Sequence, residues 1–109
     1  MNDANSEVKN IKEDLTLLKV NGQKGSNKQD RKKLATALLT TLTKHNEAKF
    51  RCVGAASLNN AILATTIASE YLKEEGKILK LTPFFDSAKF EDGVEKTCII
   101  LKVEKSIKV

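Results

Sequence analysis

The sequence predicts a small α+β domain in which two helices lie on one face of a four-stranded mixed sheet, in the chain order βαβαββ. Two stretches have the apolar spacing of helices, and four shorter stretches are typical of strands. The first two strands are each followed by a helix, which favours parallel strands, whereas the last two strands are joined by a tight turn. The predicted architecture has two layers, one of helices and one of sheet.

The first strand is predicted at residues 15–20 (LTLLKV), which are β-prone and mostly apolar. A polar stretch with two glycines, residues 21–30, follows as a loop. Within it, Ser26 and Gln29 have the spacing of a capping box and Asn27 is a competing cap, so the first helix begins here. The apolar side of this helix repeats at every fourth position, at Leu34, Leu38 and Leu42. The run KHNEA ends it.

The second helix is predicted over residues 55–74, between an alternating strand at residues 48–53 and a C-cap at Gly76. Its apolar arc is wider than the stripe of about 100° that suffices to dock a helix on a sheet. The surplus stripe consists of Ala64, Ile67 and Tyr71. We predict that a second copy of the chain covers this stripe, which makes these residues the expected dimer interface. The alternative is that the first helix covers it.

The last two strands are predicted at residues 77–84 (KILKLTPF) and 96–104, with a tight turn at Asp92-Gly93. Pro83 is expected near the end of its strand, because proline cannot donate to a β-ladder. Three of the chain's four phenylalanines lie between these strands or at their ends: Phe84, Phe85 and Phe90. We expect at least two of them to be buried, and an exposed one could stack on a base.

The net charge of +5 is concentrated in one segment, residues 19–33, which alone carries +5. Its basic residues are Lys19, Lys24, Lys28, Arg31, Lys32 and Lys33, against the single acid Asp30. Such clustering favours a polyanionic partner, and a solvated lysine-rich loop is the alternative. The start of the second helix is a further candidate, because Gly54, Ala55 and Ala56 allow close approach and free N–H groups suit a phosphate. Asn59 and Asn60 there are either hydrogen-bond donors to a base or sugar or ordinary surface residues.

Enzymatic, metal-binding and membrane-spanning roles find little support in the sequence. It has no nucleophile elbow, P-loop or dinucleotide-binding motif. Cys52 and Cys98 fit no metal-ligand spacing and are predicted to be buried, reduced and unpaired, while His45 reads as a surface or capping residue. We therefore predict no catalytic residues, no metal and no cofactor. With no apolar run long enough to span a membrane and no signal peptide, the expected location is the cytoplasm, including association with the nucleoid.

Three stretches closely resemble the stage V sporulation protein S family, whose members are similar in fold to the Alba chromatin and RNA-binding proteins. They are LTLLKV, VGAASLNNAILATTIASEYL and LTPFFDSAKFEDGVEKTCIILKVE, and together they extend from Leu15 to Glu104. The most specific motifs are G-A-x-x-L-N-x-A at residues 54–61 and D-G-x-E at residues 92–95.

Residues 1–13 are polar and are predicted to form a disordered tail. The resemblance implies a dimer-forming, Alba-like domain, which we place at residues 14–109. It also implies a regulatory role in sporulation or development through binding of DNA and/or RNA. By position in the Alba fold, the resemblance implies that the loop after the first strand contacts nucleic acid through Lys24, Lys28, Arg31, Lys32 and Lys33. It also implies that the hairpin, with Lys89 and Phe90, reaches into the minor groove. The alternative function is a protein–protein scaffold or oligomerising regulator that does not bind nucleic acid directly.

Overall fold

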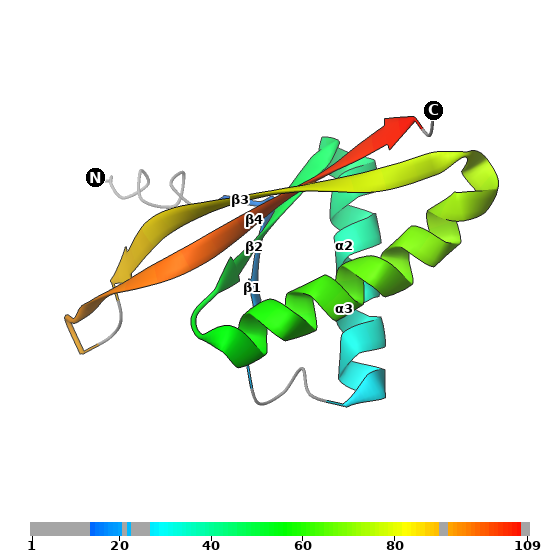
Figure 1. Ribbon diagram of the computed structural model, residues 1–109. Coiled ribbons are helices and arrows are strands. Elements are labelled where there is room, and N and C mark those ends of the chain that lie inside the picture. The colour runs from blue at the N-terminus through cyan, green and yellow to red at the C-terminus, as the bar shows by residue number, and fades with distance from the viewer. Residues whose placement is uncertain (1–13, 21, 23–26, 90–91, 108–109) are drawn as a thin grey trace, which may run out of the picture.

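The computed structural model describes residues 14–20, 22, 27–89 and 92–107 and confirms the predicted two-layer α+β fold (Figure 1). The predicted tail at residues 1–13 lies outside the described residues. The elements follow the order βαβαββ, with one 3₁₀ turn, η1, after the second helix. Their bounds are β1 Leu17–Val20, α2 Lys28–His45, β2 Glu47–Cys52, α3 Ala55–Leu72, η1 Lys73–Glu75, β3 Lys77–Lys89 and β4 Glu95–Ile107.

The four strands form one mixed sheet in the order β1-β2-β4-β3. β1 pairs with β2 in parallel, and β4 pairs antiparallel with both β2 and β3. Because β4 lies between β2 and β3, only the first crossover produces a hydrogen-bonded parallel pair. The prediction that both crossovers would do so is wrong on this point.

The core lies between the sheet and the two helices, which cover the same side of it (Figure 1). Ala48, Phe50 and Cys52 alternate along β2 and point into this core, where Phe50 lies opposite Leu101 of β4. The helices contribute small and branched side chains to the same cluster: Ala35, Leu38 and Leu42 from α2, and Ala61, Ala64 and Ala68 from α3. The predicted strand alternation and helix stripes are therefore confirmed.

The helix ends use the capping residues that the sequence offers. The side chain of Asn27 accepts a hydrogen bond from the Asp30 backbone N–H at 2.8 Å and donates to the Asp30 carboxylate at 3.0 Å. Asn27 is the competing cap in the sequence, and Ser26, which has capping-box spacing to Gln29, lies outside the described residues. α2 ends at Asn46, whose φ is 66° and whose N–H bonds the Leu42 carbonyl, and η1 ends at Gly76 with φ 71°.

The β3–β4 hairpin is longer than predicted and extends beyond the helices (Figure 1). β3 continues six residues past Pro83, so the expectation that proline would lie near the strand end is wrong. β3 is an edge strand, where a missing N–H leaves no neighbour unpaired. Phe84 is 44% exposed and Phe85 78%. The expectation that at least two of the three phenylalanines are buried is therefore wrong, and Phe90 lies outside the described residues.

Both cysteines are buried and unpaired, as predicted, and they lie on opposite faces of the sheet. Cys52 lies on the helix side, where burial, followed by the nearby Cys98, raises its pKa from 9.0 to about 11. Burial, followed by the charge of Asp86, also raises the pKa of Cys98. None of the described helices is both long and apolar enough to cross a membrane.

The raised pKa of Cys52 predicts a loss of stability in alkaline solution. Folding favours the protonated thiol, so its contribution is complete below pH 9 and is lost as the pH rises toward 11. Between pH 8 and pH 10.5 the unfolding free energy of the wild type should fall by about 2 kcal/mol more than that of Cys52→Ala. Urea unfolding of both proteins at both pH values measures this difference, and equal pH dependence would contradict it.

Candidate nucleic-acid interface

Four basic side chains gather in the first turns of α2 and form what we call the basic cluster, Lys28, Arg31, Lys32 and Lys33. Lys28, Lys32 and Lys33 are exposed, and Arg31 is half-buried. Helical spacing places residues 28 and 32 one turn apart on one side. The fifth predicted residue of this group, Lys24, lies outside the described residues.

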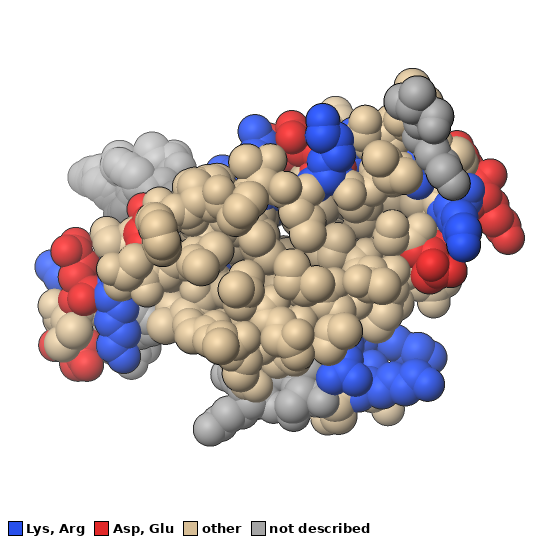
Figure 2. All heavy atoms as spheres, in the orientation of Figure 1, with Lys and Arg blue, Asp and Glu red and all other residues tan. Residues whose placement is uncertain are grey.

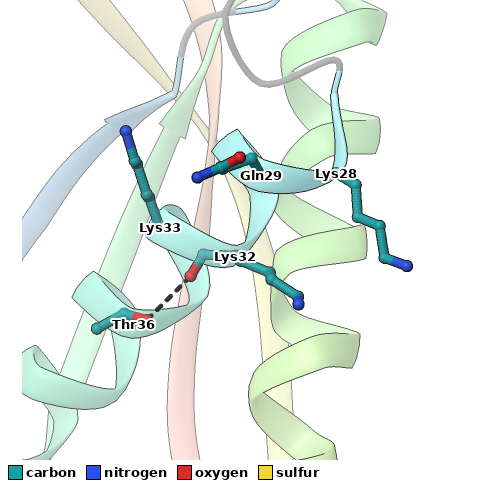
Figure 3. Close-up of a pocket in the computed structure, with 5 residues that line it drawn as sticks. All are labelled: Lys28, Gln29, Lys32, Lys33 and Thr36. Carbon is teal, nitrogen blue, oxygen red and sulfur yellow. Dashed lines mark hydrogen bonds between the residues drawn. The ribbon is translucent and has the colours of Figure 1, made fainter.

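A surface cavity of about 570 Å³ lies beside the basic cluster. Its lining residues are Lys28, Gln29, Lys32, Lys33 and Thr36. Lys28 and Lys32 extend to one side of α2, whereas Lys33 extends to the other (Figure 3). The Thr36 hydroxyl donates to the Lys32 carbonyl at 3.0 Å. Gln29 and Thr36 are uncharged, so the charge of the cavity comes from its three lysines.

Three of the four charges in the basic cluster, those of the lysines, have no ion-pair partner among the described residues. Within the described residues, Lys28, Lys32 and Lys33 form no ion pair, and the nearby Asp30 is occupied by its hydrogen bonds with the Asn27 cap. Cations at a helix N-terminus also oppose the helix dipole. The arrangement therefore concentrates positive potential where an anion lowers the electrostatic energy.

The start of α3 lies against the loop that follows β1, but the contact differs from the prediction. Gly54 has φ 90°, a conformation that favours glycine, and no atom approaches within 4 Å of where its Cβ would be. Gly54 therefore makes no close contact within the single chain, and its approach to a ligand stays a prediction. A close approach within the chain involves Ala56 and occurs at Gly22, where an added Cβ would lie 3.2 Å from the Ala56 Cβ and 3.4 Å from the Ser57 nitrogen.

The two asparagines of α3 have different environments. Asn60 is only 4% exposed, and its side-chain amide donates to the Gly22 carbonyl at 3.2 Å. In the single chain the side chain is therefore not at the surface where nucleic acid could contact it, and it links α3 to Gly22. Asn59 is exposed and remains a candidate, together with the backbone at Gly54.

The hairpin does not join the basic cluster. Lys89 is exposed at the end of β3, where its cross-strand neighbour is Glu95. Figure 2 shows acidic and basic side chains mixed at the hairpin tip and a separate group of basic side chains below α3. Phe90, the other predicted hairpin contact, lies outside the described residues.

A broad uncharged surface extends over α3 and the hairpin, with charged side chains at its rim (Figure 2). Glu70 is the only charged residue within α3. The exposed apolar side chains of this surface, which we call the apolar face, include Ile62, Leu63 and Phe85. Beneath it, a cavity of about 390 Å³ separates the start of α3 from the hairpin and is lined by Ala55, Leu58, Phe85, Thr97 and Ile99, among others.

The predicted dimer stripe is only partly at the surface. Ala64 is 0% exposed in the core of a single chain, so its assignment to a dimer interface is wrong. Ile67 is half-buried against the same core, whereas Tyr71 is 62% exposed. Sequence reasoning missed Leu63, which lies one and two turns before Ile67 and Tyr71 on the same side of α3.

Among the described residues, no three His, Cys, Asp or Glu side chains lie together where they could hold a metal ion.

The model of the family Stage V sporulation protein S (SpoVS) matches residues 17–106, from the start of β1 to the penultimate residue of β4. This match includes every strand and both helices that carry the candidate site. The chain therefore belongs to the stage V sporulation protein S family.

Proposed function

We propose that this protein is a non-enzymatic regulator that binds DNA or RNA through the phosphate backbone and acts as a dimer. The basic cluster carries this proposal. Three exposed lysines share one cavity, lack ion-pair partners within the described residues, and lie at the helix end where positive charge is least stable. Stability alone does not favour this placement, so binding of a polyanion accounts for it better.

The chemistry of the cluster favours phosphate over bases. Lysine ammonium groups on flexible side chains act as point charges and read no base sequence by themselves. The exposed Asn59 and the backbone of Gly54 lie near the same loop, since Asn60 and Ala56 of that helix contact Gly22. We therefore expect binding to unrelated sequences with similar affinity.

The apolar face supports a second copy of the chain as the dimer partner. In a two-fold dimer the same surface of each chain meets its own copy, so charged residues near the axis repel each other. An uncharged face avoids this repulsion. The basic cluster lies at the rim of this face in Figure 2 and stays open to nucleic acid when the face is covered. A dimer then presents two basic clusters to one polyanion.

A binding titration of the wild-type protein tests the proposal. Duplex DNA, single-stranded DNA and RNA are each titrated at two salt concentrations, for example by fluorescence anisotropy. We expect binding to all duplex sequences, with log K falling with log salt by about 0.9 for each phosphate contacted. Three exposed lysines thus predict a slope near −3 for one basic cluster, or roughly twice that if both clusters of a dimer contact one duplex.

The rival function, a protein–protein scaffold, predicts the opposite result. A scaffold that uses its lysines for an acidic protein partner shows no binding to nucleic acid at physiological salt. Absence of binding at about 0.15 M salt would therefore reject the proposed function, because the screening at that salt still leaves specific multivalent contacts measurable.

A further inference from the structure

The face of the sheet that points away from both helices carries a row of side chains that crosses all four strands. Along β2, Phe50 and Cys52 point into the core, so Arg51 between them points to the opposite face. The strand register continues the row on either side of Arg51. Its members, which we call the open-face row, are Lys19, Arg51, Ile100 and Phe84.

The open-face row has a cationic end and an aromatic end. Lys19 and Arg51 lie on β1 and β2, and Phe84 lies on the edge strand β3 with 44% of its surface exposed. Between them, Ile100 is buried, with 4% of its surface exposed. With strands about 4.8 Å apart, the row is roughly 14 Å long.

The cations of this row differ from their neighbours on the same face. In the next row, Lys49 is paired with Asp14 at 2.9 Å, and Lys102 lies 3.6 Å from Glu47 and 3.7 Å from Glu104. Neither Lys19 nor Arg51 forms an ion pair with a carboxylate in the described part of the chain. Their charge is therefore available to a ligand, whereas that of the next row is used by the fold.

A carboxylate on the other side of the row makes the β3 end of this surface differ in charge from the β1 end. Asp86 shares this face as the cross-strand neighbour of Cys98 and lies two residues from Phe84. A carboxylate there disfavours phosphate near β3. A nucleotide strand is therefore best placed with its phosphates over Lys19 and Arg51 and a base over Phe84.

We propose that the open-face row is a binding site for single-stranded nucleic acid, separate from the basic cluster. Phe84 stacks on a base, and Arg51 and Lys19 neutralise the adjacent phosphates. An aromatic and a cation on an open sheet are a combination that suits unpaired bases, whose faces are free to stack. Stacking on an intact duplex would require two base pairs to be unstacked first, whereas an unpaired base is already free, so this site favours single strands over duplexes. The proposal does not depend on duplex binding by the basic cluster.

Tryptophan fluorescence gives a direct test, because the chain contains no tryptophan. Phe84→Trp places a sole reporter on the open face, and Phe85→Trp places a matched reporter one residue away on the helix side of the same strand. An oligonucleotide of about ten uridines or thymidines is added to each. We expect quenching of the tryptophan at position 84 by stacking and no quenching at position 85.

Affinities of leucine variants complete the test. Loss of one stacked base lowers affinity by about 5- to 150-fold, so Phe84→Leu should weaken binding of the oligonucleotide by this factor, and Phe85→Leu should not. Arg51→Gln should reduce the salt slope by about 0.7 on a single strand. Duplex binding by Phe84→Leu should equal that of the wild type. Thermal melts check that the variants fold.

Three results would overturn the site. They are no binding of the oligonucleotide by the wild type, equal affinity of Phe84→Leu and the wild type, or no quenching at position 84. Loss of duplex binding in Lys32→Ala/Lys33→Ala with quenching at position 84 retained would support two separate surfaces. If that variant abolished the quenching as well, the open-face row would not be an independent site.

Discussion

We expect Lys32→Ala/Lys33→Ala to bind every nucleic acid more weakly than the wild type, whatever its sequence. Each lysine that neutralises a duplex phosphate contributes about 0.9 to the dependence of log K on log salt, so the salt slope should fall by up to about 1.8. If the variant and the wild type bind equally at 1 M salt, this difference in slope makes the variant bind up to about 60-fold more weakly at 0.1 M salt. Anisotropy titrations at several salt concentrations measure both quantities.

The two lysines extend to different sides of α2, which makes their single variants informative (Figure 3). If one phosphate backbone passes on the side of Lys28 and Lys32, Lys32→Ala should account for most of the loss and Lys33→Ala for little. Equal losses would indicate that the backbone crosses the helix end between them. Either result identifies the path of the nucleic acid over the basic cluster.

A variant with the same net charge controls for non-specific electrostatics. Lys44→Ala/Lys73→Ala also removes two exposed lysines, one from the last turn of α2 and one from the end of α3. It should keep nearly all of the wild-type affinity. The thermal stability of Lys32→Ala/Lys33→Ala should be unchanged or slightly higher, because cations near the start of a helix oppose its dipole by a few tenths of a kcal/mol each. Wild-type affinity and slope in Lys32→Ala/Lys33→Ala would exclude these lysines as the phosphate site.

The elements of the fold could be predicted because their signals are local. Asn27 and Gly76 mark helix ends through their own conformations or side chains, and alternation along β2 reports which residues face the core. The position of β4 between β2 and β3 could not be predicted in the same way. Strand order depends on which edges meet in space, and residue patterns within one strand do not report it.

The errors at the candidate site have the same origin. Asn60 lies in the first turns of an exposed helix, yet its partner is the carbonyl of Gly22, 38 residues earlier in the chain. The phenylalanines of the hairpin are exposed because β3 and β4 extend past the ends of the helices, a length mismatch that no single segment reveals. Ala64 and Leu63 are neighbours in sequence, and the rotation of α3 on the sheet decides which one is buried.

The rotation of α3 also decides which substitution should separate the dimer. Ile62 projects from the outer side of the helix, on the apolar face, whereas Leu63 lies between that side and the side of Ile67 and Tyr71. Tyr71 follows Ile62 by nine residues, or two and a half turns, and so lies on the opposite side of the helix from it. Both positions are exposed in the single chain, so a charge at either should leave the fold intact.

We expect Ile62→Glu to convert the dimer to a folded monomer. A carboxylate in a covered interface loses its hydration without gaining a partner, and two-fold symmetry places a second carboxylate nearby. The dissociation constant should rise by about 100-fold or more. Sedimentation velocity over a range of concentrations measures the change, and circular dichroism checks that the monomer is folded.

Tyr71→Glu separates the interface predicted from the sequence from the one that the surface favours. If the apolar face is the interface, Tyr71→Glu remains a dimer at concentrations where Ile62→Glu is a monomer. If Tyr71→Glu alone dissociates, the partner covers the side of α3 that carries Ile67 and Tyr71 instead. A wild-type protein that sediments as a monomer at the highest concentration would refute both, because a covered apolar surface of this kind is the only basis for the dimer.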